Sequence, residues 1–386
     1  MNVARRFRGI LAVGLFLAIV STAQAKYSGG SGTVQDPYQI ATAADLIALG
    51  ETSGDYDKHF ILTADIDLDP NLPGRKVFDK AVIAPDADPN TEWSFEGTPF
   101  SGVFDGNAHT ISNVTIQGGT YLGLFGRLDG GAVVKDLGVL DVNMTGSGDF
   151  VGGLGGSNAT WERKGATVTH CHSTGVIWGK NCVGGLIGGN YGNLNQCYSD
   201  ATANGDSAVG GLLGFNCGSV SQCYSNSSVK GHSAVGGLAG EQEDGYVGES
   251  YSTGRVRGDS CVGGLVAINY NGVVHDCHSS ASVNGEEKVG GFVGSSGPEE
   301  APRRSDAGVF GSFWDIQTSG QTTSFGGTGK TTAQMQTAKT FLDAGWDFVG
   351  ETKNGPEDIW WILEGKDYPR LWWELTAKDA AKPNLN

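Results

Sequence analysis

Long apolar runs are scarce in this chain of 386 residues. One run, Ile10 to Val20, follows three arginines and precedes Ala23-Gln24-Ala25, and this arrangement is typical of an export signal. The run is too short to span a membrane comfortably, and no second stretch of about 20 apolar residues follows it. We therefore expect residues 1–25 to be a signal peptide and the mature chain to have no membrane span.

Basic side chains are also in short supply. The sequence has 26 Lys and Arg against 42 Asp and Glu, a net charge of -16. Removal of residues 1–25 would take Arg5, Arg6 and Arg8 with it, so that the charge becomes -16 - 3 = -19. Nucleic acids and anionic lipids are bound through Lys and Arg, so this composition argues against both as partners. It suits a soluble protein outside the cell.

Glycine, in contrast, is abundant, with 63 residues, more than twice the usual share of about 7%. It does not recur at every third position, which excludes collagen. The glycines belong instead to a recurring Gly-Leu-large-Gly unit. Copies of this unit, the last two degenerate, begin at Gly123, Gly153, Gly185, Gly211, Gly237, Gly264 and Gly291. From Gly185 onward the spacings are 26, 26, 27 and 27 residues, and a fixed period of this size predicts a solenoid.

Each repeat divides into short β-prone segments with Gly, Asn or Asp at the corners. In one repeat these segments are Val183 to Gly188, Leu194 to Ser199 and Ala201 to Ala203. None is long enough, or periodic at 3.6 residues, to be a helix. We therefore predict an all-β fold in which three strands per coil stack in parallel on the preceding coil, about 4.8 Å away.

Equivalent positions in successive repeats form columns that support this stacking. One column is Val183, Val209, Val235, Val262 and Val289, and another is Cys171, Cys197, Cys223, Ser250 and Cys277. Small side chains at one point of each coil indicate an inward ladder in a narrow core, so we interpret these cysteines as buried thiols. A bridge such as Cys171 to Cys197 is left open as the alternative, because adjacent coils bring Cα atoms near disulfide distance.

The repeated unit resembles the GLUG-motif proteins, exported bacterial repeat proteins. The opening from Tyr27 to Ile40 and the segment Phe100 to Gly106 are also similar to such proteins. The resemblance implies a right-handed parallel β-helix with no established activity. The motif also accompanies some immunoglobulin-cleaving metallopeptidases, but the seven histidines here include no His-Glu-x-x-His, so that chemistry does not carry over.

An open solenoid needs capped ends, because unpaired strand edges invite aggregation. We expect an N-terminal cap and first coils over 26–120, with a helix from Thr42 to Leu49, and repeat coils over 121–296. A Trp-rich capping region should occupy 297–386, with a helix from Ala333 to Asp343. Six of the nine tryptophans lie there, and we expect them to cover the last coil: Trp314, Trp346, Trp360, Trp361, Trp372 and Trp373.

Three segments have a superficial likeness to ligand sites. Asp65, Asp67 and Asp69 alternate with apolar residues and could hold calcium, although a solvated strand face is the favoured interpretation. Histidines flank Cys171 and Cys277 as in zinc sites, but the two groups should be four coils, or about 19 Å, apart. Gly326 to Thr332 lacks the first glycine of a phosphate-binding loop, so we interpret it as a loop entering the C-terminal helix. We predict no metal and no cofactor.

One further column is aromatic, and it is the candidate ligand site: His172, Tyr198, Tyr224, Tyr251 and His278. If the neighbouring Cys and Ser residues point inward, these rings point outward and could stack on sugar rings. The alternation does not decide this, because Val220, Gln222 and Tyr224 share parity and could be the inward set. Ordinary ladder stacking is the simpler interpretation.

Catalytic carboxylates are not evident, since the only charged residues between Gly165 and Gly240 are Lys180, Asp200, Asp206 and Lys230, which share no column. We therefore expect a non-enzymatic, monomeric, secreted or surface protein, an adhesion or scaffold module that binds an extracellular glycan or a surface protein. The alternative is a carbohydrate-active β-helix enzyme, either a polysaccharide lyase or a glycoside hydrolase. A third possibility is an envelope component with no diffusible ligand.

Overall fold

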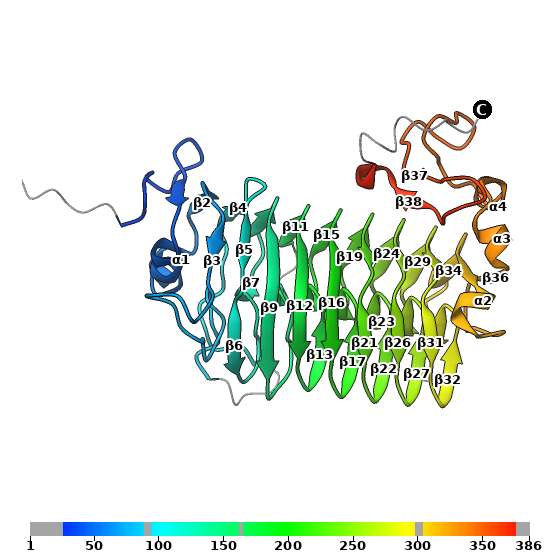
Figure 1. Ribbon diagram of the computed structural model, residues 1–386, viewed down its shortest axis with the longest axis horizontal. Helices are drawn as coiled ribbons and strands as arrows, with labels where there is room; N and C mark the ends of the chain where they lie inside the picture. The colour runs from blue at the N-terminus through cyan, green and yellow to red at the C-terminus, as the bar shows by residue number, and fades with distance from the viewer. Residues whose placement is uncertain (1–25, 89–93, 161, 163–164, 298–303, 376–386) are drawn as a thin grey trace, which may run out of the picture.

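The computed structural model describes residues 26–88, 94–160, 162, 165–297 and 304–375. They form one parallel β-solenoid, with successive coils stacked along a single axis (Figure 1). The predicted parallel solenoid is therefore confirmed. The expected signal segment 1–25 lies outside the described residues.

The strands of the coils build four parallel sheets. The first contains β1 (Tyr38–Ile40), β2 (His59–Leu62), β4 (Val103–Asp105), β8 (Val133–Lys135), β11 (Thr167–Thr169), β15 (Asn193–Asn195), β19 (Ser219–Ser221), β24 (Tyr246–Gly248), β29 (Val273–His275) and β34 (Gly308–Phe310). The second contains β7 (Phe125–Leu128), β10 (Gly155–Asn158), β14 (Ile187–Asn190), β18 (Leu213–Asn216), β23 (Ala239–Glu243), β28 (Val266–Tyr270) and β33 (Val293–Ser295). The third contains β13 (Asn181–Gly184), β17 (Ser207–Gly210), β22 (Ser233–Gly236), β27 (Ser260–Gly263) and β32 (Glu287–Gly290).

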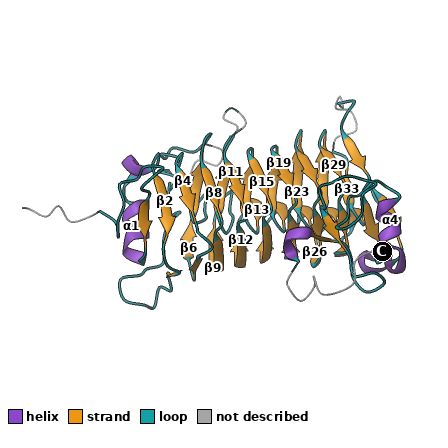
Figure 2. Ribbon diagram, turned by 90° about the horizontal axis from the view of Figure 1, so that it is seen from above, coloured by secondary structure: helices purple, strands orange, loops and turns teal. Residues whose placement is uncertain are grey.

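The fourth and longest sheet carries the candidate site, and we call it the long sheet. It contains β3 (Ile66–Asp67), β5 (Thr110–Ser112), β6 (Thr115–Gly118), β9 (Gly138–Gly146), β12 (His172–Trp178), β16 (Tyr198–Asn204), β20 (Tyr224–Ser225), β21 (Ser228–Lys230), β25 (Tyr251–Ser252), β26 (Arg255–Arg257), β30 (His278–Ser279), β31 (Ser282–Asn284), β35 (Phe313–Asp315) and β36 (Thr328–Lys330). Viewed from above, its strands run side by side along the body of the molecule (Figure 2).

The prediction of three strands per coil was wrong, because a complete coil such as β13-β14-β15-β16 has four. The predicted strand Val183 to Gly188 is divided: β13 ends at Gly184 and β14 begins at Ile187. The predicted strand Leu194 to Ser199 is also divided, since Gln196, with φ 52°, turns the chain between β15 and β16. A left-handed residue interrupts the extended backbone that a strand requires.

The division at the paired glycines has a steric cause. A Cβ on Gly210 would lie 1.9 Å from the carbonyl oxygen of Leu213, and one on Gly211 would lie 2.1 Å from the hydroxyl of Ser225. The last glycine of the motif, Gly214, approaches the backbone of Cys182 equally closely, at 2.3 Å. The motif therefore marks a corner where backbone packs against backbone, and only glycine fits there.

Two columns of left-handed residues that are not glycine recur from coil to coil, one inside the strands of the third sheet and one at the turn before the long sheet, and the sequence did not indicate either. One column has φ between 50° and 52°: Cys182, Ala208, Ala234, Cys261 and Lys288. The other has φ between 41° and 52°: His170, Gln196, Gln222, Glu249 and Asp276. This conformation costs a non-glycine residue about 1 kcal/mol or more, and here it is imposed by the stacking of equivalent positions.

The predicted valine column is confirmed. Val183, Val209, Val235, Val262 and Val289 are direct partners in adjacent coils. All seven cysteines fall among the described residues and are free thiols, so the Cys171 to Cys197 bridge is not formed. The ladder cysteines are buried, and Cys277 Sγ donates to the carbonyl oxygen of His275 at 3.2 Å.

A buried amide ladder was not anticipated. Its side chains donate from one coil to the next, with N···O distances of 2.8, 2.8, 3.3 and 3.2 Å. The members, all at most 9% exposed, are Asn158, Asn190, Asn216, Gln242 and Asn269. Each amide donates to its equivalent in the next coil, so burial does not leave these donors without a hydrogen-bond partner.

The N-terminal cap contains helix α1 (Ala43–Gly50), as predicted, and Thr42 and Asp45 begin it with reciprocal capping hydrogen bonds. The 3₁₀ helix η1 (Ser53–Asp55) follows it. At the other end, the predicted helix from Ala333 to Asp343 is instead two short helices, α3 (Thr332–Met335) and α4 (Ala338–Leu342), after α2 (Ile316–Ser319). Residues 328–330, expected as loop, form β36 on the last coil.

The chain beyond α4 does not simply close the end of the solenoid. The strands β37 (Trp360–Trp361) and β38 (Arg370–Leu371), with the 3₁₀ helix η2 (Trp372–Glu374), fold back over the upper edge of the last coils (Figure 1). We call residues 359–374 the strap. Trp360 is buried by this arrangement, and Trp372 stays 43% exposed.

We expect Gly210→Ala to destabilise the protein by about 3 kcal/mol or more, because overpacking against fixed backbone cannot be relieved by a rotamer change. The measurement is urea unfolding followed by circular dichroism. Gly54→Ala is the matched control, since a Cβ there meets no atom within 4 Å. Equal stability of the two variants would contradict the corner argument.

We expect all seven thiols to react with a chromogenic disulfide reagent when the protein is denatured without a reductant. In the folded protein the reaction of Cys277 should be slow, because burial raises the pKa of its thiol well above its usual range and limits access to it. Fewer than seven reactive groups in the denatured protein would show that a bridge forms.

Candidate functional site

The aromatic column predicted from the sequence is a continuous stack on the long sheet. His172, Tyr198, Tyr224, Tyr251 and His278 each begin a strand and are direct partners in register. Successive ring centroids lie 4.6, 4.8, 5.0 and 4.9 Å apart, with planes within 8° of parallel. We call this set the ring ladder.

The ring ladder faces away from the solenoid core. Cys171 and Ser173, on either side of His172, are 1% and 0% exposed and point inward. The alternative inward set is wrong, because the left-handed residue Gln222 shifts the alternation between Val220 and Tyr224. Val220 is buried in the core, whereas the ring of Tyr224 lies on the outer face.

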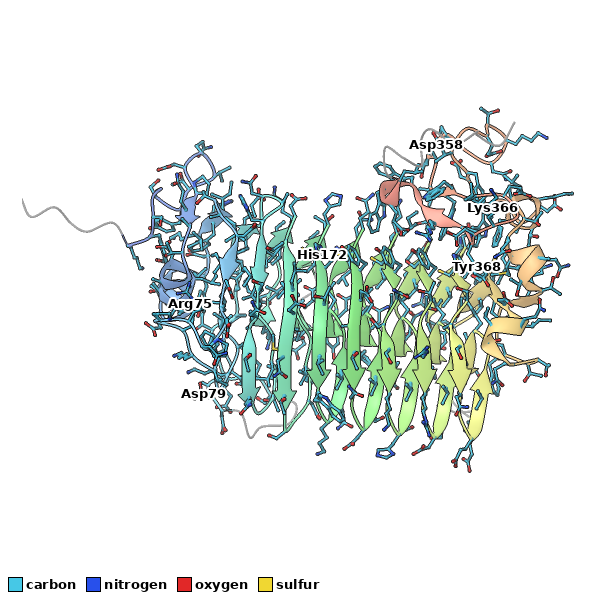
Figure 3. All side chains as sticks on the ribbon, viewed as in Figure 1. Arg75, Asp79, His172, Asp358, Lys366 and Tyr368 are labelled. Carbon is cyan, nitrogen blue, oxygen red and sulfur yellow. The ribbon has the colours of Figure 1, made fainter. Side chains whose placement is uncertain are left out.

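The strap covers one end of the ring ladder. Trp373 lies 5.6 Å from Tyr224, and Trp360 lies 5.7 Å from His278, between ring centroids. Exposure consequently falls along the ladder, to 6% at Tyr251 and 0% at His278. The other end is open, and His172 lies beside the strap rather than under it (Figure 3).

A cavity of about 250 Å³ separates the strap from the ring ladder. One wall is formed by the rings of Tyr198, Tyr224, Tyr251 and His278, and the floor by the next outward column of the long sheet, Asp200, Asn226 and Thr253. The strap contributes the opposite wall, Asp367, Tyr368, Pro369, Arg370 and Glu374. Aromatic ring edges and polar groups thus converge on one space, as apolar and polar groups do in small-molecule sites.

The polar groups of the strap are held in place. Glu374 accepts hydrogen bonds from the Tyr251 hydroxyl at 2.8 Å and from the Leu371 amide at 2.9 Å. Burial raises the pKa of Glu374, while the Leu371 bond lowers it. Arg370 donates to Asp367 at 2.7 Å. The sequence did not reveal these residues as part of the site, because no spacing rule brings them to a ladder some 120 residues earlier.

His278 is the buried end of the ring ladder. Its Nε2 lies 2.8 Å from the carbonyl oxygen of Pro369, which can only accept, so Nε2 carries the proton. The other ring nitrogen, Nδ1, is buried and has no hydrogen-bond partner within the described ranges. Burial lowers the pKa of His278 to about 4.

The segments considered for metal ions are occupied by local hydrogen bonds. Asp65 accepts from the Thr110 amide at 2.9 Å, and Asp67 accepts from the Asn113 amide group at 2.9 Å. These bonds lower the pKa of both carboxyls. Among the residues that the structure describes, no group of three or more His, Cys, Asp or Glu side chains is placed to hold a metal.

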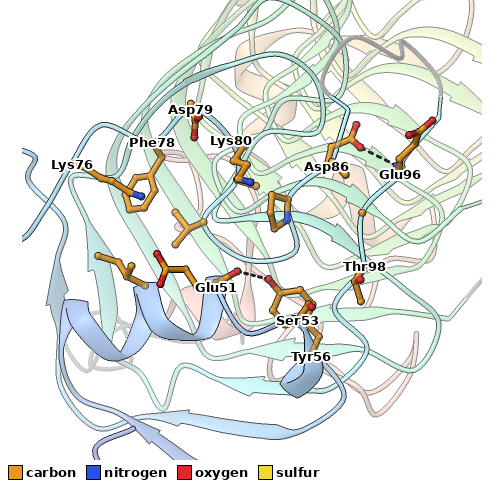
Figure 4. A pocket seen from close by; sticks show the side chains of 17 residues that line it. Glu51, Ser53, Tyr56, Lys76, Phe78, Asp79, Lys80, Asp86, Glu96 and Thr98 are labelled. Carbon is orange, nitrogen blue, oxygen red and sulfur yellow. Dashed lines mark hydrogen bonds between the residues drawn. The ribbon is translucent and has the colours of Figure 1, made fainter. Parts of the chain in front are cut away.

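A second and larger cavity, of about 580 Å³, lies at the N-terminal end between α1 and residues 76–87 (Figure 4). Its charged side chains are of both signs, including Glu51, Lys76, Asp79 and Lys80. Asp86, 3% exposed, accepts from the Glu96 amide and from Thr120 and so serves the local fold. These side chains do not form an arrangement typical of one kind of reaction or ligand.

Comparison with known proteins agrees with this fold. The model of the GLUG motif matches residues 258–284. A solved structure from Bacteroides ovatus, provisionally assigned as an immunoglobulin A1 protease, superposes with a TM-score of 0.55 at 17% identity, covering 90% of this chain and 96% of its own. The chain carries the GLUG motif within a parallel β-solenoid fold, as the sequence indicated.

Two curated relatives share part of the sequence. Halomucin of Haloquadratum walsbyi is 34% identical over 165 residues, which are 41% of this chain and 2% of halomucin. A protein of Evansella cellulosilytica, provisionally named a Gly-rich membrane protein, is 30% identical over 174 residues, 40% of this chain and 18% of that protein. The helices in the described part of this chain lack the length and hydropathy that a membrane crossing requires.

We expect acid to weaken the attachment of the strap through His278. Its pKa falls from 6.5 to about 4 on folding, so stability is complete above pH 6.5 and declines as the pH approaches 4, by up to about 3 kcal/mol. The raised pKa values of Asp276, about 6, and of Glu374 act in the opposite sense. The measurement is therefore the difference between wild type and His278→Gln, which retains both carboxyls, by urea unfolding followed by tryptophan fluorescence. The same pH dependence in both proteins would contradict this role.

Proposed function

We propose that the protein is an exported, surface-associated binding module that holds a glycan at the open end of the ring ladder. The single observation that supports this most is the pairing of stacked, outward rings with a polar cavity in one place. Sugar rings have apolar faces that pack on aromatic rings and hydroxyls that require hydrogen-bond partners. The ring edges of Tyr198 and Tyr224 offer apolar contact, and Asp200, Asn226 and Thr253 offer hydrogen-bond partners.

The polar floor of the cavity is arranged for such binding. Thr253 donates to Asn226 at 2.7 Å, and Asn226 donates to Asp200 at 3.4 Å. Side chains oriented by their neighbours lose little entropy when a ligand arrives. Because the strap fixes the opposite wall, the site suits the end or a short stretch of a sugar chain.

Export and surface location belong to the same proposal. The pattern of residues 1–25 and the membrane protein among the relatives favour them. A peptidase role is not part of the proposal, because the sequence has no His-Glu-x-x-His. Cleavage of polysaccharide is the competing function, and binding without cleavage is what we propose.

We expect purified protein to be retained by one or more plant, algal or bacterial polysaccharides without releasing products. Tyr198→Ala should weaken that binding about tenfold, the equivalent of about 1.4 kcal/mol, because it removes a ring from the open wall. Tyr246→Ala removes a ring from β24, in another sheet, and should bind as wild type. The measurement is affinity electrophoresis together with analysis of reducing ends.

Two results would contradict the proposal. Release of oligosaccharides would favour the carbohydrate-active enzyme instead. Absence of binding on a broad glycan array, combined with self-association of the protein, would favour a structural component of the envelope.

A further inference from the structure

The long sheet exposes a second surface, at the edge opposite the ring ladder. Two outward columns run there, each in direct register from coil to coil. One is Val176, Thr202, Ser228, Arg255 and Ser282. The other is Trp178, Asn204, Lys230, Arg257 and Asn284.

Three cations cluster in these columns. Lys230 is the direct partner of Arg257, and Arg255 lies two residues before Arg257 on the same strand, so that all three point outward from adjacent coils. All three side chains are exposed. Like charges placed directly opposite each other in a sheet destabilise it. We call Lys230, Arg255 and Arg257 the basic stripe.

The three cations of the basic stripe are adjacent, and no neighbouring carboxylate neutralises them. Across the described ranges, none of the three has a carboxylate within ion-pair distance. Several other cations are paired: Lys135 with Asp105, Arg304 with Asp306, Lys339 with Asp343 and Arg370 with Asp367. The carboxylate of Asp259 is engaged by His232 at 2.8 Å. A cluster of unpaired cations on a chain with net charge -16 favours an anionic partner.

An exposed aromatic surface adjoins the stripe. Trp178 is 50% exposed and Val176 is 40% exposed, among the few large apolar side chains left open. A hollow of about 170 Å³ lies beside Trp178, and Asn204, Lys230 and His232 line it. A flat apolar ring next to amide and ammonium groups can pack on a sugar face while its substituents are bound.

We propose that this surface binds an anionic polysaccharide, one whose sugars carry carboxylate or sulfate groups. Guanidinium groups match both anions with paired hydrogen bonds. Successive coils present cations about 4.8 Å apart, and three cations suit a polymer of moderate charge density. Nucleic acid carries one charge per about 1.7 Å, so the surrounding carboxylates of Asp206, Asp259 and Glu286 would repel it more strongly than a polysaccharide with fewer charges. The inference rests on the proposed glycan-binding function and names the class of glycan.

The test uses a triple variant, Lys230→Asn, Arg255→Ser and Arg257→Asn. The new residues are those that neighbouring coils carry at the same positions, namely Asn204, Asn284, Ser228 and Ser282, so the coils should still stack. The control triple, Lys58→Asn, Lys339→Asn and Lys353→Asn, makes the same change in net charge at distant sites. Circular dichroism and the melting temperature confirm folding of both.

The probes are polygalacturonate, a sulfated galactan, a neutral galactan and duplex DNA, with the Kd of each measured at low and at moderate salt. We expect wild type to prefer an anionic glycan, the stripe variant to bind it at least tenfold more weakly, and the control triple to change the Kd less than twofold. Equal losses in both triples, or tighter binding of DNA than of either anionic glycan, would overturn the inference. Retention of neutral glycan alone, abolished by Tyr198→Ala, would overturn it while leaving the proposed function intact.

Discussion

The structure depends on the contact of backbone with backbone at the paired glycines of each coil. At Gly210 and Gly211 the chain turns so tightly, and lies so close to the coils on either side, that a single added carbon would overlap a carbonyl oxygen or a hydroxyl. Backbone hydrogen bonds fix the height of one coil on the next at about 4.8 Å, and the glycines let the corners approach to that distance. Because the height is fixed, every other position of the coil meets its equivalent in the next, and the valine column, the amide ladder and the ring ladder follow.

The features that repeat with the period of the coil could be predicted from the sequence. The valine and cysteine columns, the parallel stacking and the cap helix after Thr42 could all be predicted, because each depends on local pattern and spacing. The four strands per coil could not, because one division of each coil depends on a left-handed residue such as Gln196. Glutamine does not favour that conformation alone, and only the stacked neighbours impose it. The same left-handed corners explain why strict alternation could not decide which way Tyr224 points.

Only one part of the candidate site, the ring ladder, could be predicted from the sequence. The ring ladder recurs with the coil and was found, whereas the strap that completes the cavity occurs once and has no repeated partner. Glu374 meets Tyr251 across 123 residues of sequence, and no periodicity links them. Net charge conceals local detail in a related way. A value of -16 describes the chain as a whole, yet one edge of the long sheet carries three unneutralised cations.

Coil length varies without disturbing the stack, and the amide ladder shows where the variation is absorbed. Asn216 pairs with Gln242, 26 positions on, but Ser219 pairs with Tyr246, 27 positions on, so the extra residue sits in the turn between them. Beyond that turn every column resumes its alignment. Evolution can therefore lengthen a single turn, or duplicate a whole coil, without moving either outer edge of the long sheet. The length of the solenoid along its axis can therefore change by whole coils. The outward side chains of each coil can change independently of that length.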